Sequence, residues 1–352
     1  MTSKRRERNE KVADHSCFTS YCDRSVYVYK NRSKGGRYDI RLYNRDTASY
    51  NSLTKYHKYI SSIATDTFAF DKNGRVIGDV PSKQLTYAKK NKIKTWAVIS
   101  NYNDAIYDFD GNLANRVMTD KTARKRFTDQ LISLAKKHHY YGVNIDFEAV
   151  NPKDRSAYSS FIQYVSQALK KKHIKTMVSV PAKSADDKND DWSWPYDYAK
   201  IGKYADYVQV MTYDEHGIWG EPGSVASTGW IKRSLQFSVK KIKANKVIMG
   251  VPAYGYDWDL KDGSSSSAQE WNDIKSLIKK QKAKPAFNKK TGSMTFSYTD
   301  KKKHKHVVWY ENEKTIETKS RLAKQYKIAG VSVYALGHES ESFWKAIQKG
   351  TK

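Results

Sequence analysis

Two carboxylates stand two positions apart in the segment 142–148, which reads GVNIDFE. The polar residues Asn144, Asp146 and Glu148 alternate with three apolar ones, as expected for a strand with one polar and one apolar face. Burying two unpaired acids costs free energy, so in a buried strand this pattern indicates chemistry. Repulsion from Asp146 raises the proton affinity of Glu148, which can then act as a general acid near neutral pH.

A half-solvated antiparallel strand is the alternative interpretation, and the neighbouring elements oppose it. Apolar runs typical of strands alternate along the chain with amphipathic helical stretches such as 120–137 and 151–171. In the second stretch Asn151 can cap the helix and Pro152 suits its first turn. One face of that helix presents five apolar side chains: Tyr158, Phe161, Ile162, Val165 and Leu169.

Eight strand candidates follow one another in this alternation. They are residues 38–43, 67–70, 95–100, 142–148, 176–181, 207–213, 247–252 and 330–335. Eight β-then-α units predict an α/β protein whose parallel sheet closes into a (β/α)8 TIM barrel, with an open doubly wound sheet as the alternative. Active sites of such barrels lie at the C-terminal ends of the strands. Glu148 ends the fourth predicted strand, so its position agrees with its chemistry.

Two segments lie outside the alternation. Residues 1–36 are polar and basic, which predicts a flexible leader and linker before a catalytic barrel over residues 37–352. Between the seventh and eighth strands, residues of about 257–312 hold a serine tract, a helix and two strand-like runs, so we expect a small α+β insertion there. His304 and His306 fall in a lysine-rich turn, where we expect a solvated hairpin tip and no metal site.

The composition favours a polyanionic partner. The chain has 352 residues, with 64 Lys and Arg against 37 Asp and Glu, which gives a net charge of +27. A charge of this size steers association with nucleic acid, anionic membrane or anionic cell wall. The 26 Tyr and 9 Trp are suited to stacking on sugar rings. No nucleic-acid-binding module is recognisable, so we expect no specific nucleic-acid partner.

Cysteine content and hydropathy bear on disulfides, membrane spans and export. The two cysteines, Cys17 and Cys22, lie in the expected leader, so the barrel relies on no disulfide, and whether these two pair is left open. No apolar run reaches the roughly 20 residues of a membrane span. Residues 1–31 lack the apolar segment of a secretory signal. We expect a monomer without cofactor or transmembrane segment, and the route of export stays open.

The sequence resembles glycoside hydrolase family 18, whose fourth-strand motif reads D-G-x-D-x-D-x-E. Residues 141–148, YGVNIDFE, match this motif. The chain is most similar to the bacterial spore-germination branch of the family, in the N-I-D-F-E form, in residues 152–158, in SVPAK at 179–183 and in ALGHE at 335–339. The likeness covers roughly residues 37–349, which makes chance a poor explanation.

The spacing of the acids restricts the mechanism that the resemblance implies. Residues two apart on a strand lie about 6.6 Å from each other and project the same way. Asp146 therefore cannot flank a sugar opposite Glu148 as the nucleophile of an ordinary retaining pair would. An acetamido group at C2 of the substrate supplies its own carbonyl oxygen as nucleophile and forms an oxazolinium, and Asp146 can orient and stabilise the N–H of that group.

The resemblance assigns further residues. The M-x-Y-D motif of the sixth strand is matched by residues 211–214. It implies that Tyr213 donates its hydroxyl to the acetamido carbonyl and that Asp214 helps to hold the sugar, with Gln209 and Met211 on the side of Tyr213. The motif GVPAYGY at 250–256 implies that Tyr254 contacts the sugar. Four tryptophans in predicted loops are candidates for stacking or for local packing: Trp192, Trp194, Trp219 and Trp258.

Three positions depart from the family pattern. Tyr141 and Asn144 replace the first two acids of the fourth-strand motif, and Tyr334 replaces the tryptophan that commonly floors the cleft. Asn144 can hydrogen-bond Asp146 but cannot share a proton with it, so we expect a pH profile unlike that of chitinases. Tyr334 can still stack on a sugar over a smaller area.

The resulting hypothesis is a glycosidase that cleaves β-1,4 bonds at N-acetylglucosamine residues, in peptidoglycan of the cell wall or spore cortex. The alternatives are a chitinase acting on chitin oligomers, a lectin-like barrel without activity, and a polyanion-binding surface protein. Retention of Glu148 favours an enzyme over a lectin. Peptidoglycan and its anionic polymers would place the protein outside the cell, in the envelope or at the spore. Internal and terminal cleavage are equally compatible with the sequence.

Overall fold

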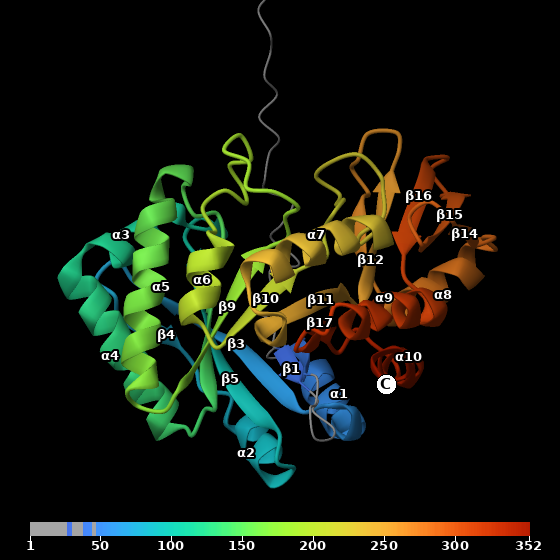
Figure 1. Ribbon diagram of the computed structural model, residues 1–352. Helices are drawn as coiled ribbons and strands as arrows, with labels where there is room; N and C mark the ends of the chain where they lie inside the picture. The colour runs from blue at the N-terminus through green and yellow to red at the C-terminus, as the bar shows by residue number, and fades with distance from the viewer. Residues whose placement is uncertain (1–26, 30–37, 44–46) are drawn as a thin grey trace, which may run out of the picture.

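The computed structural model describes residues 27–29, 38–43 and 47–352, and eight of its strands form a closed parallel barrel (Figure 1). Each strand pairs in parallel with the next, and β17 pairs with β2 to close the ring. The strands are β2 (Tyr38–Tyr43), β3 (Ser62–Phe70), β5 (Lys94–Ser100), β8 (Gly142–Asp146), β9 (Lys175–Pro181), β10 (Tyr207–Met211), β11 (Val247–Pro252) and β17 (Gly330–Leu336). The predicted (β/α)8 barrel is confirmed, and the open sheet is excluded.

Helices follow the strands and surround the barrel in Figure 1. They are α1 (Thr47–Tyr56), α2 (Ser82–Lys90), α3 (Gly111–Thr119), α4 (Lys121–Lys137), α5 (Arg155–Lys170), α6 (Tyr198–Tyr204), α7 (Thr228–Lys241), α9 (Glu313–Gln325) and α10 (Glu341–Thr351). Short 3-10 turns lie at His57–Tyr59, Pro152–Asp154 and Ala244–Lys246. The apolar face predicted for α5 is completely buried. It packs against Val143, Ile145 and Phe147, the outward-facing residues of the fourth barrel strand and its end.

Three sequence predictions fail in detail at element ends. β3 begins at Ser62, five residues before the predicted start at position 67. Asn151 does not cap the helix that follows it, because the chain first makes a 3-10 turn and the Asn151 amide instead lies 3.4 Å from the Asp154 carboxylate. Strand β8 ends at Asp146, so Glu148 lies two residues beyond it rather than at its last position.

An antiparallel sheet forms the expected α+β insertion between β11 and β17 and projects at the upper right of Figure 1. Its strands are β12 (Tyr254–Asp259), β13 (Ser267–Glu270), β14 (Ala286–Asn288), β15 (Ser293–Thr299) and β16 (Lys305–Tyr310), in the order β13-β12-β16-β15-β14. Helix α8 (Trp271–Gln281) packs on the sheet through Ile274, which joins Phe296, Val308 and Tyr310 in a buried cluster. The insertion therefore starts three residues before the expected position 257.

The range 1–36 is described at one place only. Strand β1 (Tyr27–Tyr29) pairs antiparallel with β3, and the short β4 (Val76–Gly78) pairs with the same strand further along. The other residues of that range, with Cys17 and Cys22, lie outside the described residues. The boundary between a leader and the barrel at residues 36 and 37 stays a prediction.

His304 and His306 are buried, so the expectation of a solvated tip for these two side chains was wrong. His304 is 8% exposed and His306 3% exposed, and their Nδ1 atoms lie 2.8 Å from Asp259 and 2.9 Å from Asp257. The two carboxylates come from β12, which pairs with β16 and places Asp259 opposite His306. The lysine-rich composition of the turn hid this pairing, because the partners lie 45 and 49 positions earlier in the chain.

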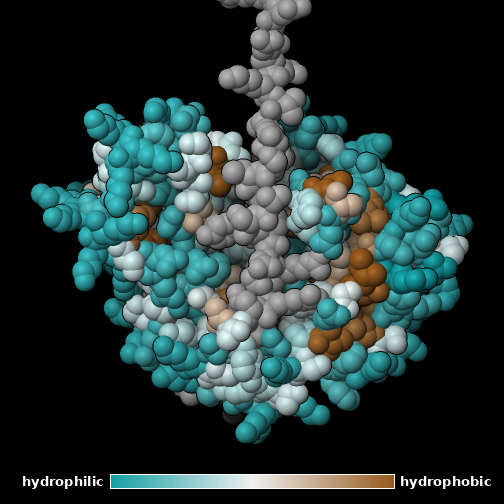
Figure 2. Space-filling view, turned by 180° about the vertical axis from the view of Figure 1, so that it is seen from behind, coloured by the Kyte–Doolittle hydropathy of each residue, from teal (hydrophilic) through white to brown (hydrophobic). Residues whose placement is uncertain are grey.

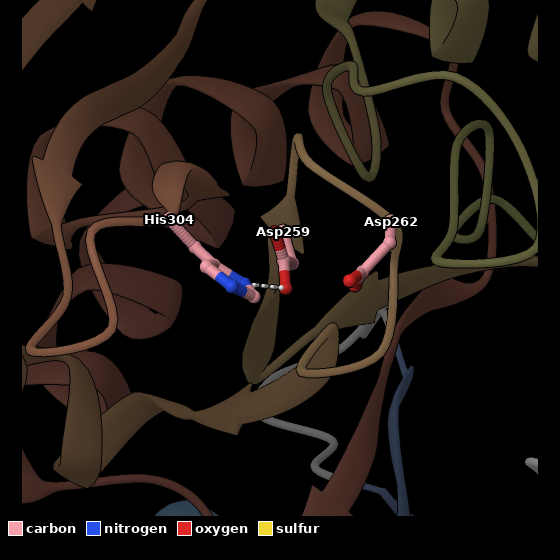
Figure 3. A group of neighbouring side chains, drawn as sticks. All are labelled: Asp259, Asp262 and His304. Atoms are coloured by element: carbon pink, nitrogen blue, oxygen red, sulfur yellow. Dashed lines mark hydrogen bonds and ion pairs between the residues drawn. The ribbon is translucent and has the colours of Figure 1, made fainter.

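Figure 3 shows His304 and Asp259 joined by a hydrogen bond, with Asp262 approaching from the loop after β12. Ligand-type atoms of these three residues lie within 4.8 Å of one another. Asp259 already accepts the Ser265 hydroxyl at 2.6 Å and the backbone N–H of Lys261 at 2.9 Å. The Lys261 ammonium lies 3.2 Å from His304 Nε2, where it would compete with a cation. These contacts indicate that the three residues anchor the loop after β12.

Candidate active site

The acids and tyrosines singled out from the sequence gather at the C-terminal end of the barrel. Asp146 ends β8, and Glu148 follows two residues later. Tyr213 and Asp214 follow β10, Tyr254 begins β12, and Tyr334 belongs to β17. The charges of Asp146 and Asp214 both act on Glu148, which connects the β8 and β10 sides of the site.

Burial and repulsion act together on the two acids after β8. Burial is the main reason that the pKa of Glu148 lies well above its ordinary value, and the charges of Asp146 and then Asp214 raise it further. Burial also raises the pKa of Asp146 to about 6, against a hydrogen bond from Ser179 that lowers it. Burial and the nearby negative charges therefore both favour the protonated form of Glu148.

The main chain of Glu148 is held by side chains rather than by strand pairing. Its N–H donates to Asn101 Oδ1 at 2.9 Å, and its carbonyl accepts from Asn101 Nδ2 at 2.8 Å. The preceding carbonyl, of Phe147, accepts the hydroxyl of Tyr196 at 2.8 Å. Ala149 then adopts φ +49°, a left-handed conformation unusual for a residue with a Cβ, and turns the chain away from the site.

Tyrosine rings form one wall of the site. The ring centroid of Tyr213 lies 5.5 Å from that of Tyr334 and 6.5 Å from that of Tyr254. Gly250 makes room for this wall, because a Cβ at that position would meet the Tyr213 ring at 2.6 Å. The first glycine of the GVPAYGY stretch therefore serves the packing of Tyr213.

Asp214 stands where the chain leaves the barrel after Tyr213, in a left-handed conformation with φ +63°. Tyr254 and Tyr256 donate their hydroxyls to its Oδ1 at 2.5 Å and 2.9 Å. The surrounding protein raises the pKa of Asp214 to about 6, although these two hydrogen bonds lower it. Its side chain remains accessible to solvent, so water screens part of this effect.

A layer of polar side chains lies below the acids, inside the barrel. Asn144, Ser179 and Gln209 are all buried, and Asn144 Nδ2 donates to Ser179 Oγ at 3.0 Å. From the sequence, Asn144 could hydrogen-bond Asp146, but in the structure Ser179 bonds Asp146. Neither polar atom of the Gln209 amide has a hydrogen-bond partner among the described residues. Met211, on the same strand, packs with Tyr213 and Tyr254.

The four candidate tryptophans divide into two pairs. Trp258 is 3% exposed and donates its Nε1–H to the carbonyls of Gly217 and Gly220, and Trp194 lies under the guanidinium of Arg155 at 4.1 Å. Both are committed to local packing. Trp192 and Trp219 are 52% and 49% exposed. The Trp219 ring lies 5.7 Å from Tyr256, which places it beside the wall of tyrosines.

Sequence reasoning missed three residues that touch the site residues directly: Asn101, Ser179 and Tyr256. A signal existed for the first, since Asn101 directly follows the predicted strand 95–100 at the end where barrel enzymes place their sites. Ser179 and Tyr256 lie within stretches that carried the family resemblance. Their partners depend on which strands are neighbours.

A closed parallel barrel with two neighbouring carboxyl groups of raised pKa at its C-terminal end has the architecture of a glycosidase. The chain belongs to glycosyl hydrolases family 18, whose family model matches residues 24–339. A Bacillus subtilis protein described as the uncharacterized glycosylase YvbX is 83% identical over 328 residues, covering 93% of this chain and 95% of that protein.

Solved structures agree with this membership. The chitinase of Chromobacterium violaceum has a TM-score of 0.83 and 34% identity, over 87% of this chain and 96% of that chain. The spore cortex-lytic enzyme SleL of Bacillus megaterium has a TM-score of 0.80 and 25% identity, over 87% of this chain and 71% of that chain. The protein is thus a glycosidase, related to chitinases and to cortex-lytic enzymes.

In the part of the chain that the structure describes, no helix combines the length and the apolar character needed to cross a bilayer.

Proposed function

We propose that the protein hydrolyses the β-1,4 bond on the reducing side of N-acetylglucosamine in peptidoglycan, with retention and through an oxazolinium intermediate. The observation that supports this most directly is the pairing of Glu148, whose pKa is held high, with the buried Asp146 two residues earlier. Glu148 protonates the leaving oxygen, and the acetamido oxygen of the substrate attacks the anomeric carbon. Glu148 then removes a proton from the incoming water.

The remaining residues would hold the acetamido group and its sugar. Asp146 accepts the amide N–H as positive charge develops on the oxazolinium, and Tyr213 donates its hydroxyl to the acetamido carbonyl. Asp214, held by Tyr254 and Tyr256, accepts from a sugar hydroxyl. Tyr334 stacks on the ring, while Gln209, Met211 and Asn144 shape the floor. This chemistry is acid–base and substrate-assisted, so no cofactor or metal takes part in the proposed steps.

Peptidoglycan is favoured over chitin by the likeness to SleL, named as a spore cortex-lytic enzyme, and by the polyanionic character expected of the partner. The test is digestion of purified spore cortex, vegetative peptidoglycan and N-acetylglucosamine oligomers, with products analysed by mass spectrometry. We expect muropeptides that end in reducing N-acetylglucosamine, with the β-anomer formed first by NMR. Products from chitin oligomers alone would make the protein a chitinase, and inverted products would exclude substrate assistance.

Charge on the insertion supports attachment to the anionic polymers of the wall. Between residues 271 and 305 there are eleven lysines against two aspartates. All eleven are exposed, and within the described residues Lys275 alone among them has an ion-pair partner, Glu313. The face shown in Figure 2 is largely hydrophilic and carries several hydrophobic areas. The exposed lysines make charge the expected force for docking on an anionic polymer. We call these residues the insertion lysines.

Replacing six insertion lysines by glutamine is expected to weaken retention on isolated walls without affecting cleavage of neutral oligomers. The six are Lys279, Lys280, Lys282, Lys284, Lys289 and Lys290. The matched control replaces six exposed lysines on the α4 and α5 side: Lys121, Lys136, Lys137, Lys170, Lys171 and Lys172. Cosedimentation at rising salt, before and after extraction of wall phosphodiesters, measures the effect. If retention on the walls falls equally in both variants, retention depends on the net charge of the protein, and the insertion has no special role.

This proposal places the protein outside the cytoplasm, at the cell envelope or the spore, acting as a monomer on an insoluble polymer. A lectin-like barrel is the competing function, and it predicts binding without turnover. Turnover by the wild type that is lost in Glu148→Gln, with binding retained, distinguishes the two.

A further inference from the structure

Strand pairing stops before the catalytic acid. The last residue of β8 paired with β5 is Asp146, opposite Ser100, and pairing with β9 ends one residue earlier at Ile145. Glu148 therefore gains no support from the sheet on either side. A carboxyl group that must protonate one oxygen of a bound sugar has to be held to within a fraction of an ångström.

Asn101 takes the place of the missing ladder. Its side-chain amide is fully buried and bonds both backbone groups of Glu148, as a neighbouring strand would. The orientation of the amide is determined by its partners. Nδ2 also donates to the carbonyl of Asp110 at 3.1 Å, so a flipped amide would put an oxygen against two carbonyls and an NH2 group against an N–H.

We call the two hydrogen bonds between Asn101 and the Glu148 main chain the clamp. Further contacts hold Asn101 itself in place. The Asn101 carbonyl accepts the N–H of Asp110 at 3.0 Å, and the Asp110 side chain caps α3. Between them runs the hairpin of β6 (Tyr102–Asn103) and β7 (Asp108–Phe109). At the start of α3, a Cβ on Gly111 would meet the carbonyl of Ala149 at 2.4 Å, so the helix also packs directly on the turn after Glu148.

We propose that Asn101 is a positioning residue: it locates the Glu148 carboxyl for proton transfer by clamping the Glu148 main chain. This inference rests on the assignment of Glu148 as the general acid. It predicts that loss of the clamp lowers the rate of the chemical step and leaves substrate binding nearly intact, because the hydrogen bonds of the Asn101 side chain go to Glu148 and Asp110.

The first test compares Asn101→Ala with Asn103→Ala, using N-acetylglucosamine oligomers. Asn103 belongs to the same hairpin, but its amide donates to the Asp110 carboxylate at 2.9 Å instead of to Glu148. For Asn101→Ala we expect kcat to fall about 10- to 100-fold, with KM within about threefold of the wild type. For Asn103→Ala both constants should stay within about threefold. An equal loss of kcat in the two variants would overturn the proposal, since it would trace the effect to the hairpin.

The second test uses the near-isosteric Asn101→Asp and does not depend on the alanine variant folding. A protonated aspartic acid can still donate to the Glu148 carbonyl, whereas an aspartate would repel it. The ratio of kcat for Asn101→Asp to kcat for the wild type should therefore rise as pH falls. A ratio that is flat across pH would exclude the clamp. Glu148→Gln in the same assay tests the proposed function separately, because activity retained in that variant would overturn the role of Glu148 as general acid.

Discussion

Glu148→Gln is expected to lower kcat by roughly 10²- to 10⁴-fold, the usual contribution of a general acid. Glutamine keeps the size and hydrogen-bonding shape of the side chain but has no proton to give to the leaving oxygen. Binding of N-acetylglucosamine oligomers should persist, because the tyrosines and Asp214 remain in place. Initial rates and calorimetric titration on the same oligomer measure the two effects separately.

The same substitution should make the fold more stable at neutral pH. The folded protein raises the pKa of Glu148 above its ordinary value of 4.5, so folding opposes ionisation of this group. The stability penalty is absent below pH 4.5, where the unfolded chain is protonated too, and it grows as pH rises above that value. Glutamine removes the penalty, so the melting temperature of the variant should exceed that of the wild type at neutral pH and match it in acid.

Glu221→Gln is the matched control, since Glu221 is an exposed glutamate in the loop after β10. It should change neither activity nor stability. Substantial turnover by Glu148→Gln would remove Glu148 from the mechanism, and absence of turnover in the wild type, with binding intact, would favour the lectin-like function. If Glu148→Gln melts at a lower temperature than the wild type, the lost activity would be due to a damaged fold.

The alternation of residues 142–148 was sufficient to predict which side chains enter the barrel. Val143, Ile145 and Phe147 lie in the core under the helices, and Asp146 lies on the other side, near Glu148. This prediction succeeded because side-chain direction in a strand depends only on local geometry. The number of strands could be counted for the same reason, since each apolar run is a local signal.

Contacts between distant strands could not be predicted in this way. Asn101 meets Glu148 across 47 positions, and Asn144 bonds Ser179 across 35. Both contacts depend on which strands are neighbours and on their register. The buried histidines were mispredicted for the same reason. The lysines around His304 indicated that its side chain is exposed to solvent, but its partner Asp259 lies on a strand 45 positions away. Local composition correctly predicted that the lysines of the turn are exposed, but wrongly predicted the same for its two histidines.

Asp146→Asn is expected to lower kcat by about 10²- to 10³-fold, a loss typical of removing one group that stabilises charge in the transition state. Asparagine cannot offer a negative charge to the acetamido N–H as the oxazolinium forms. In addition, the pKa of Glu148 should fall, because Asp146 is the largest of the charges that raise it. The alkaline limb of the rate profile, where the general acid loses its proton, should therefore move to lower pH.

The acid limb does not separate the two carboxylates, because the protein raises the pKa of both Asp146 and Asp214 above the ordinary value. The alkaline limb does separate them. Asp214 contributes less than Asp146 to the raised pKa of Glu148, so Asp214→Asn should move this limb less than Asp146→Asn does. Profiles of kcat against pH for the wild type and the two variants measure how far the alkaline limb moves in each. If the limb stays in place in both variants, a group other than Glu148 donates the proton.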